Sequence, residues 1–133
     1  MLFRSLNIRG WRCFFFFAVD SYWIEEILLK MSELEAPPSI LERARKKMRE
    51  DKMDTGFTYS SYATKQSVVV IGKQSSGAEF LNSFCHELRH LTDDIASVLD
   101  YPMKGEKVAY LTGDIALEVA DIVCMMCCDR CRI

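Results

Sequence analysis

The chain has 133 residues, of which 50% are hydrophobic and 27% charged, with a formal net charge of -2 at pH 7. A chain of this length and composition is expected to fold into one globular domain with its own core, without a long disordered tail. The small net charge provides no basic field of the kind that draws proteins onto nucleic acid or acidic membranes. We therefore expect neither partner.

The start of the chain has the order of a secretory signal peptide, with arginines at positions 4, 9 and 12 around the beginning of an apolar run at Cys13–Phe17. The run is too short, Asp20 follows it, and no small-residue cleavage site is present. The sequence contains no stretch of about 20 apolar residues, so we expect no transmembrane helix. We expect a soluble, cytoplasmic protein. Residues 1–10 carry little pattern and are interpreted as a disordered N-terminal extension of a single domain spanning 1–133.

Residues 11–19 form a run of Phe and other apolar residues, which predicts a buried strand with Asp20 or Ser21 as the cap of a following helix. That helix should end at the proline pair at positions 37 and 38. A second helix with a cationic surface is expected over residues 39–53. We interpret this surface as a solvated face rather than a binding patch, because acidic residues partly neutralise it.

Two β-branched and aromatic runs, Gly56–Tyr59 and Ser67–Ile71, are separated by a polar loop and predict a hairpin. Ser76 and Glu79 then have the spacing of a capping box, which predicts a helix over residues 77–99. Strands and helices in this order indicate an α+β fold, with a small antiparallel or mixed sheet packed against helices.

On the helix over residues 77–99, the apolar side chains fall on one stripe at about 100° per residue, and we expect this stripe to face the core. The only two histidines, His86 and His90, leave that stripe together, with Glu87 between them. Four-residue spacing puts both rings within reach of one Zn²⁺, and Glu87 can then deprotonate a bound water. The alternative is chance spacing of two surface histidines. The predicted core stripe consists of Phe80, Leu81, Phe84, Leu88, Leu91, Ile95, Val98 and Leu99.

A third zinc ligand is expected from a last helix over residues 105–127, which begins next to Glu106. One face of this helix carries small and apolar residues, and we expect it to pack inward. A carboxylate at the head of a buried face is costly unless it is paired or metal-bound, so we favour Glu106 as the ligand. The alternative is an ordinary charge at a helix N-terminus. The residues of this face are Glu106, Tyr110, Gly113, Leu117 and Ala120.

The segment His86-Glu87-Leu88-Arg89-His90, with Glu106 on the following helix, resembles the gluzincin metallopeptidases, and among them the small single-domain members encoded by phages and mobile elements. The resemblance covers about residues 67–120. It implies a zincin-like fold that binds zinc through His86, His90 and Glu106. It also implies that Glu87 is the general base in the hydrolysis of a peptide or protein substrate.

The sequence departs from these enzymes at Tyr110, where they have an aspartate that orients a histidine. Asp94, one turn past His90, is the candidate for fixing an imidazole tautomer instead. No third histidine is available as an oxyanion donor, so Tyr110 or Arg89 would take that role. These departures keep two alternatives open: a zinc-containing interaction protein without robust turnover, and a helical scaffold without metal.

In the same family the strand before the active-site helix borders the cleft and pairs with extended peptide. The resemblance therefore implies Val68, Val69 and Val70 as the substrate strand. If this strand is at the sheet edge, a peptide can add to it. Its continuous apolar run is also typical of an interior strand that is paired on both sides.

Four cysteines near the C-terminus form the pattern C-x-x-C-C-x-x-C, which is a candidate for a second zinc or iron–sulfur site. On a continuous helix Cys124 and Cys131 would stand about 10 Å apart, too far to share one ion. We therefore expect free thiols that act as small apolar core residues, and the metal alternative holds only if the helix ends near Cys127. Cys85 is likewise expected on the core side.

Overall fold

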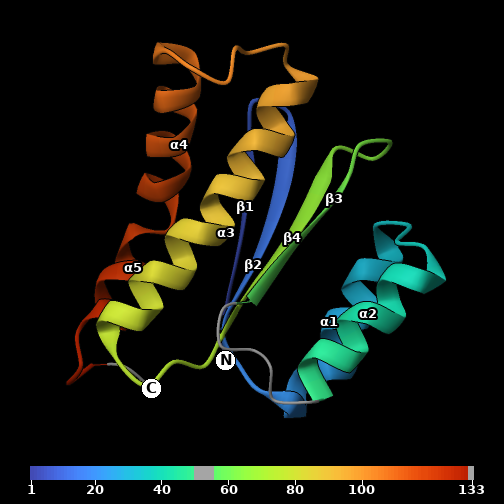
Figure 1. The fold of residues 1–133 in the computed structure, drawn as a ribbon, viewed down its shortest axis with the longest axis vertical. Helices are drawn as coiled ribbons and strands as arrows, with labels where there is room; N and C mark the ends of the chain where they lie inside the picture. Colours follow the sequence, from blue (N-terminus) through green and yellow to red (C-terminus); the bar gives the residue numbers. More distant parts are fainter. Residues whose placement is uncertain (50–55, 132–133) are drawn as a thin grey trace.

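A mixed four-stranded sheet lies between two layers of helices in the computed structural model, which describes residues 1–49 and 56–131 (Figure 1). The central strands β2 and β4 are parallel, and each outer strand is antiparallel to its neighbour. The predicted α+β class is therefore confirmed. In sheet order the strands are β1 (Leu2–Ile8), β2 (Trp11–Val19), β4 (Gln66–Gly72) and β3 (Gly56–Ser61).

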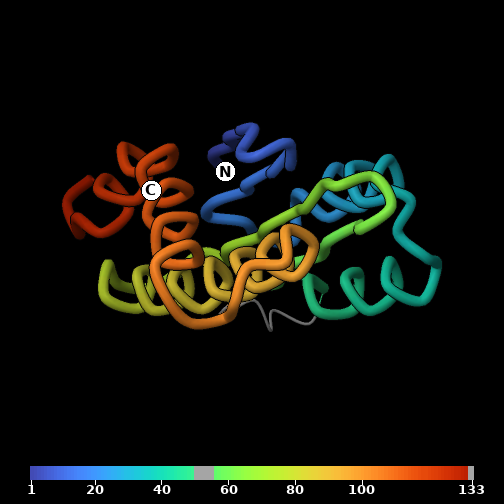
Figure 2. Tube along the Cα trace, turned by 90° about the horizontal axis from the view of Figure 1, so that it is seen from above, coloured from blue at the N-terminus to red at the C-terminus, as the bar shows by residue number. Residues whose placement is uncertain are grey.

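Helices cover both faces of the sheet (Figure 1, Figure 2). On one face α1 (Ile24–Glu33), preceded by a 3-10 turn, packs beside α2 (Pro38–Arg49). The other face is covered by α3 (Gly77–Val98), α4 (Glu106–Glu118) and α5 (Ala120–Cys127). In the part of the chain that the structure describes, no helix is long and apolar enough to cross a membrane.

The apolar run of β2 contributes side chains to the hydrophobic cores on both faces of the sheet. Phe15 and Phe17 pack in the core under α3, whereas Phe14 and Phe16 pack in the core under α1 and α2. Successive side chains of a strand point to opposite faces, so a strand with both faces covered must be apolar at every position. Full burial of each such ring contributes about 1.5–3 kcal/mol, which makes this strand the centre of the fold.

The expectation that residues 1–10 form a disordered extension is wrong, because Leu2–Ile8 is the edge strand β1, paired with β2 along its whole length. A two-residue turn at Arg9 and Gly10, with φ of 48° and 80°, joins the two strands. Such left-handed turns match the twist of a hairpin. Arg4 further ties β1 to Asp121 of α5 through hydrogen bonds of 2.7 and 3.1 Å. A short edge strand that is exposed at alternate positions carries little sequence pattern.

The predicted helix caps and the predicted hairpin are confirmed. Asp20 accepts a hydrogen bond from the backbone of Tyr22, and Ser76 accepts one from the backbone of Glu79. The hairpin strands β3 and β4 pair antiparallel. The second helix begins at Pro38, the second proline of the pair and one residue before the predicted start, and the end predicted for it at residue 53 lies outside the described residues.

The predicted last helix is divided at Val119 into α4 and α5, and its predicted inward face is wrong. Tyr110 and Leu117 are 65% and 74% exposed, while Leu111 and Ile115 are fully buried. The reason is that the aliphatic positions four residues apart, Leu111, Ile115 and Val119, form a more apolar stripe than the one headed by a glutamate. On α3, Leu81 is also exposed, although most of the predicted stripe is buried.

The cysteines are all free, but only Cys13 is buried. The expectation of a core position is wrong for Cys85, Cys124 and Cys131, which are exposed, whereas Cys127 is partly buried and packs against the core. Helix α5 ends at Cys127, so the four C-terminal cysteines do not lie on one continuous helix, and a metal site there is not excluded by helix geometry. Among residues 1–49 and 56–131, however, no group of three or more His, Cys, Asp or Glu side chains is arranged to hold a metal ion.

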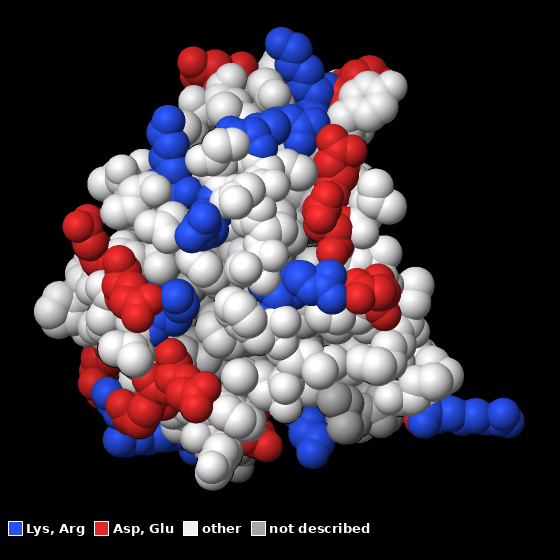
Figure 3. All heavy atoms as spheres, turned by 180° about the vertical axis from the view of Figure 1, so that it is seen from behind, with Lys and Arg blue, Asp and Glu red and all other residues white. Residues whose placement is uncertain are grey.

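Charged side chains of both signs are interspersed over the face opposite to that of Figure 1 (Figure 3). On the α2 surface, Arg45 forms an ion pair with Glu25 of α1. The cationic helix is thus partly neutralised by its neighbour.

We predict that the six thiols differ sharply in reactivity. Burial raises the pKa of Cys13 to about 12, and only the thiolate is nucleophilic. Titration of native protein with an aromatic disulfide reagent should label five thiols before Cys13, which should react only on unfolding. The Cys13→Ala variant should lack that slow class. Six thiols reacting at one rate in the native state would contradict the buried position of Cys13 under α3.

Candidate active site

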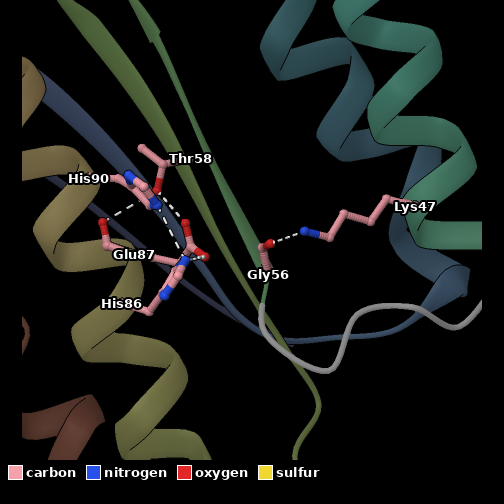
Figure 4. A network of polar contacts seen from close by, with 6 residues as sticks. All are labelled: Lys47, Gly56, Thr58, His86, Glu87 and His90. Atoms are coloured by element: carbon pink, nitrogen blue, oxygen red, sulfur yellow. Dashed lines mark hydrogen bonds and ion pairs between the residues drawn. The ribbon is translucent and has the colours of Figure 1, made fainter.

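The candidate site lies where the middle of α3 faces the edge strand β3 (Figure 4). A pocket of about 330 Å³ opens between these two elements and extends to α2. Three of the residues predicted for zinc chemistry, His86, Glu87 and His90, line this pocket together with Asp94. The full lining is Lys47, Gly56, Phe57, Thr58, His86, Glu87, His90 and Asp94.

The two histidines leave the core face of α3 together, as predicted, and both are exposed. Their Nε2 atoms are 3.2 Å apart, and the rings meet edge to face. Two ligands of a tetrahedral zinc ion, each about 2.0–2.1 Å from the metal, lie roughly 3.3 Å apart. The imidazole pair therefore has the separation that one zinc ion requires.

Glu87 is only 2% exposed, although the preceding residue, His86, is exposed. The hydroxyl of Thr58 donates to Oε1 of Glu87 at 2.9 Å, while Oε2 lies 3.9 Å from Nε2 of His86. An ionised carboxylate buried with one hydrogen bond is costly unless a cation or a proton compensates it. The carboxylate is thus held against the imidazole pair in an environment that favours a positive charge beside it.

Thr58 is a site residue that the sequence analysis did not identify. It lies on β3, 29 residues before Glu87, and the contact depends on how α3 lies across the sheet. The only local signal is the alternation of β3, in which Thr58 and Ser60 face α3 while Phe57 and Tyr59 pack on the other layer. A polar stripe that faces a helix indicates polar partners on that helix.

Asp94 accepts hydrogen bonds from Ser60 at 2.6 Å and from Tyr62 at 3.1 Å. Burial, together with the Asp94 carboxylate, raises the pKa of Tyr62, which keeps its hydroxyl protonated as a donor. The partners of Asp94 within the described chain are thus hydroxyls of the hairpin rather than an imidazole ring. Asp94 lines the pocket as expected, but here it ties α3 to β3 instead of fixing a histidine tautomer.

The structure does not bring Glu106, Tyr110 or Arg89 to this pocket. Glu106 is exposed at the start of α4, and α4 lies on the side of α3 away from β3 (Figure 1, Figure 2). Tyr110 is also exposed on α4, and Arg89 pairs with Asp93 along the outer surface of α3. In the described part of the chain the histidines therefore gain no third side-chain ligand.

The interior alternative holds for the predicted substrate strand, and the expectation of an open edge there is wrong. Val68, Val69 and Val70 are fully buried in β4, which pairs with β2 on one side and β3 on the other. Their continuous apolar run serves both helix layers, as is typical of an interior parallel strand. Within the described residues β3 pairs with β4 alone, so the edge that borders the pocket belongs to β3.

We predict that Thr58→Val destabilises the fold by about 1–3 kcal/mol, because a buried carboxylate loses its hydrogen-bond donor. Urea unfolding in chelator-treated buffer measures this cost, which should shrink in the Glu87→Gln background, where no charge is buried.

Thr64→Val is the matched control, because the hydroxyl of Thr64 is buried without a hydrogen-bond partner in the described structure. That substitution should be neutral or stabilising. Equal losses at positions 58 and 64 would contradict a specific role for the contact between Thr58 and Glu87.

No protein-family model, curated protein or solved structure gives a significant match to this chain.

Proposed function

We propose that this protein is a zinc-dependent hydrolase with a zincin-like fold, and that it cleaves peptide bonds in a peptide or protein substrate. One observation carries the proposal: the Nε2 atoms of His86 and His90 stand 3.2 Å apart, directly beside the buried carboxylate of Glu87. Two imidazoles four residues apart on a helix can bind zinc, and the glutamate between them is placed to act as the base of a zinc hydrolase.

His86 and His90 fit a zinc ion as a pair, because imidazole nitrogen suits zinc and their separation matches two tetrahedral positions. When bound there, zinc would polarise a carbonyl group and acidify water. Across the described ranges no third ligand joins the pair. Two protein ligands from these ranges are one fewer than a catalytic zinc site usually has.

Glu87 is proposed as the general base. Its Oε1 is engaged by Thr58, which leaves Oε2 as the oxygen on the side of the histidines. The free oxygen can take a proton from the attacking water and return it to the leaving amine. Thr58 then acts as a positioning residue, because it fixes the carboxylate rotamer without touching the reacting atoms.

The edge strand β3 supports a peptide as the substrate. Its outer edge, which has no strand beside it in the described structure, borders the pocket that contains the histidines. An extended peptide can add to such an edge through main-chain hydrogen bonds, which brings its own carbonyl groups past the site. We therefore propose β3, rather than β4, as the substrate strand.

A zinc-containing interaction protein without turnover remains the second candidate. It is favoured by the positions of Tyr110 and Arg89, because neither proposed oxyanion donor lines the pocket. Loss of an oxyanion donor costs a hydrolase about two to three orders of magnitude in turnover. The same imidazole pair and open strand edge would serve peptide binding alone.

We predict one zinc equivalent per chain after dialysis against trace zinc, measured by mass spectrometry of the metal. The double variant His86→Ala, His90→Ala should lose it. Glu106→Gln should retain it, because Glu106 is exposed on α4 outside the pocket. Stoichiometric zinc in the double histidine variant would remove the proposed site, and zinc lost in Glu106→Gln would restore Glu106 as the third ligand.

Glu87→Gln should keep the zinc but slow hydrolysis of a peptide library by about 10²- to 10⁴-fold, because the amide cannot accept the proton. Glu106→Gln again serves as the matched control and should cleave at the rate of the unaltered protein. Zinc binding by the unaltered protein without any cleavage of the library would exclude the hydrolase and leave the interaction protein.

A further inference from the structure

A second hollow of about 250 Å³ lies beside the candidate active site, between α2 and β3. The two hollows share the lining residues Lys47, Phe57 and Thr58, so they adjoin at the edge strand. The second hollow has an apolar floor and a basic rim on α2. Its lining consists of Met31, Ile40, Arg43, Ala44, Lys47, Phe57, Thr58 and Tyr59.

The basic rim consists of Arg43 and Lys47, which are one helical turn apart on α2. No ion pair or hydrogen bond joins Arg43 to another residue of the described chain, in contrast to Arg45, which is paired with Glu25. Lys47 reaches across to the backbone carbonyl of Gly56 at 2.5 Å (Figure 4). A neutral carbonyl does not cancel the charge of Lys47, and within residues 1–49 and 56–131 neither cation of the rim is paired with a carboxylate.

Tyr59 adds a neutral donor to the same hollow. Burial, and secondarily the carboxylate of Glu35, raises the pKa of Tyr59, so its hydroxyl stays protonated. A guanidinium, an ammonium and a phenol above apolar side chains match a carboxylate carried on an aliphatic stem or chain end. The apolar floor would exclude water from such an ion pair and strengthen it.

Side chains of a peptide added beside β3 would alternate between the two faces of the sheet, so some of them would reach this hollow. Thr58 faces α3 and the histidines, whereas Phe57 and Tyr59 face the α2 layer. Successive side chains of an extended peptide also point to opposite faces. A peptide residue whose neighbour lies at the histidines would therefore direct its own side chain toward Arg43.

We propose that Arg43 and Lys47, with the hollow beneath them, form a subsite that binds a carboxylate of the peptide next to the bond presented to His86 and His90. The carboxylate belongs either to an acidic side chain or to the peptide C-terminus. This inference rests on the proposed function, because it assumes a peptide that lies along β3. Arg43 is its main specificity determinant, since Lys47 is already held by the Gly56 carbonyl.

The test is a binding measurement that does not depend on cleavage. Fluorescently labelled peptides are titrated into Glu87→Gln protein, with and without zinc, and followed by anisotropy. One pair of peptides differs by Glu or Gln at a single position, and a second pair by a free or amidated C-terminus. One pair should show about tenfold tighter binding of the carboxylate form. The pair that shows it identifies the source of the carboxylate.

The added Arg43→Gln substitution should reduce this preference to near unity, and Arg43→Lys should restore part of it. Arg49→Gln is the matched control on the same helix, outside both hollows, and should keep the full preference. Equal binding within both pairs, or a preference unchanged by Arg43→Gln, would overturn the inference. If the unaltered protein cleaves neutral peptides but shows no preference that depends on Arg43, the subsite is rejected and the proposed hydrolase function is kept. An Arg43-dependent preference in a protein without zinc or cleavage would uphold the subsite and reject the hydrolase.

Discussion

The candidate site depends on the packing of α3 against β3, which brings the hydroxyl of Thr58 to the buried carboxylate of Glu87. A charge so deeply buried has few acceptable positions, because each lost partner leaves it uncompensated. The contact of Asp94 with Ser60, one turn further on, ties the same two elements a second time. With both carboxylates turned toward the sheet edge, His86 and His90 open on the pocket rather than on the outer surface. The candidate chemistry thus depends on a packing contact between a strand and a helix.

The asymmetry of the sheet explains where a substrate could lie. The parallel strands β2 and β4 are covered on both faces and paired on both sides, so they supply stability and no free backbone. The polar and aromatic strand β3 lies outside them, and hollows open on both sides of it. One hollow contains the histidines and the other contains Arg43. A single strand edge therefore joins a proposed reaction site to a proposed specificity site.

The sequence predicted much of the local architecture. Both the hairpin and the caps at Asp20 and Ser76 are present as predicted, and so is the departure of the histidines from the core stripe. Edge strand β1 was missed, because half of its residues face solvent and its pairing depends on a two-residue turn. For α4 the sequence predicts a buried face led by Glu106, but the aliphatic stripe through Leu111 and Ile115 packs against the core instead, because it buries more apolar surface.

By itself the sequence determined the local features, which depend on residues within one or two helical turns of each other. The spacing of His86 and His90 is sufficient to bring their rings together, because residues four apart on a helix share a face. Only the tertiary structure decided which distant groups join them. Thr58 reaches Glu87, and Glu106 stays away, because the packing of α3 on β3 and the path of the chain into α4 set those distances. Such contacts depend on the sum of many weak interactions between segments far apart in the chain, which no local spacing encodes.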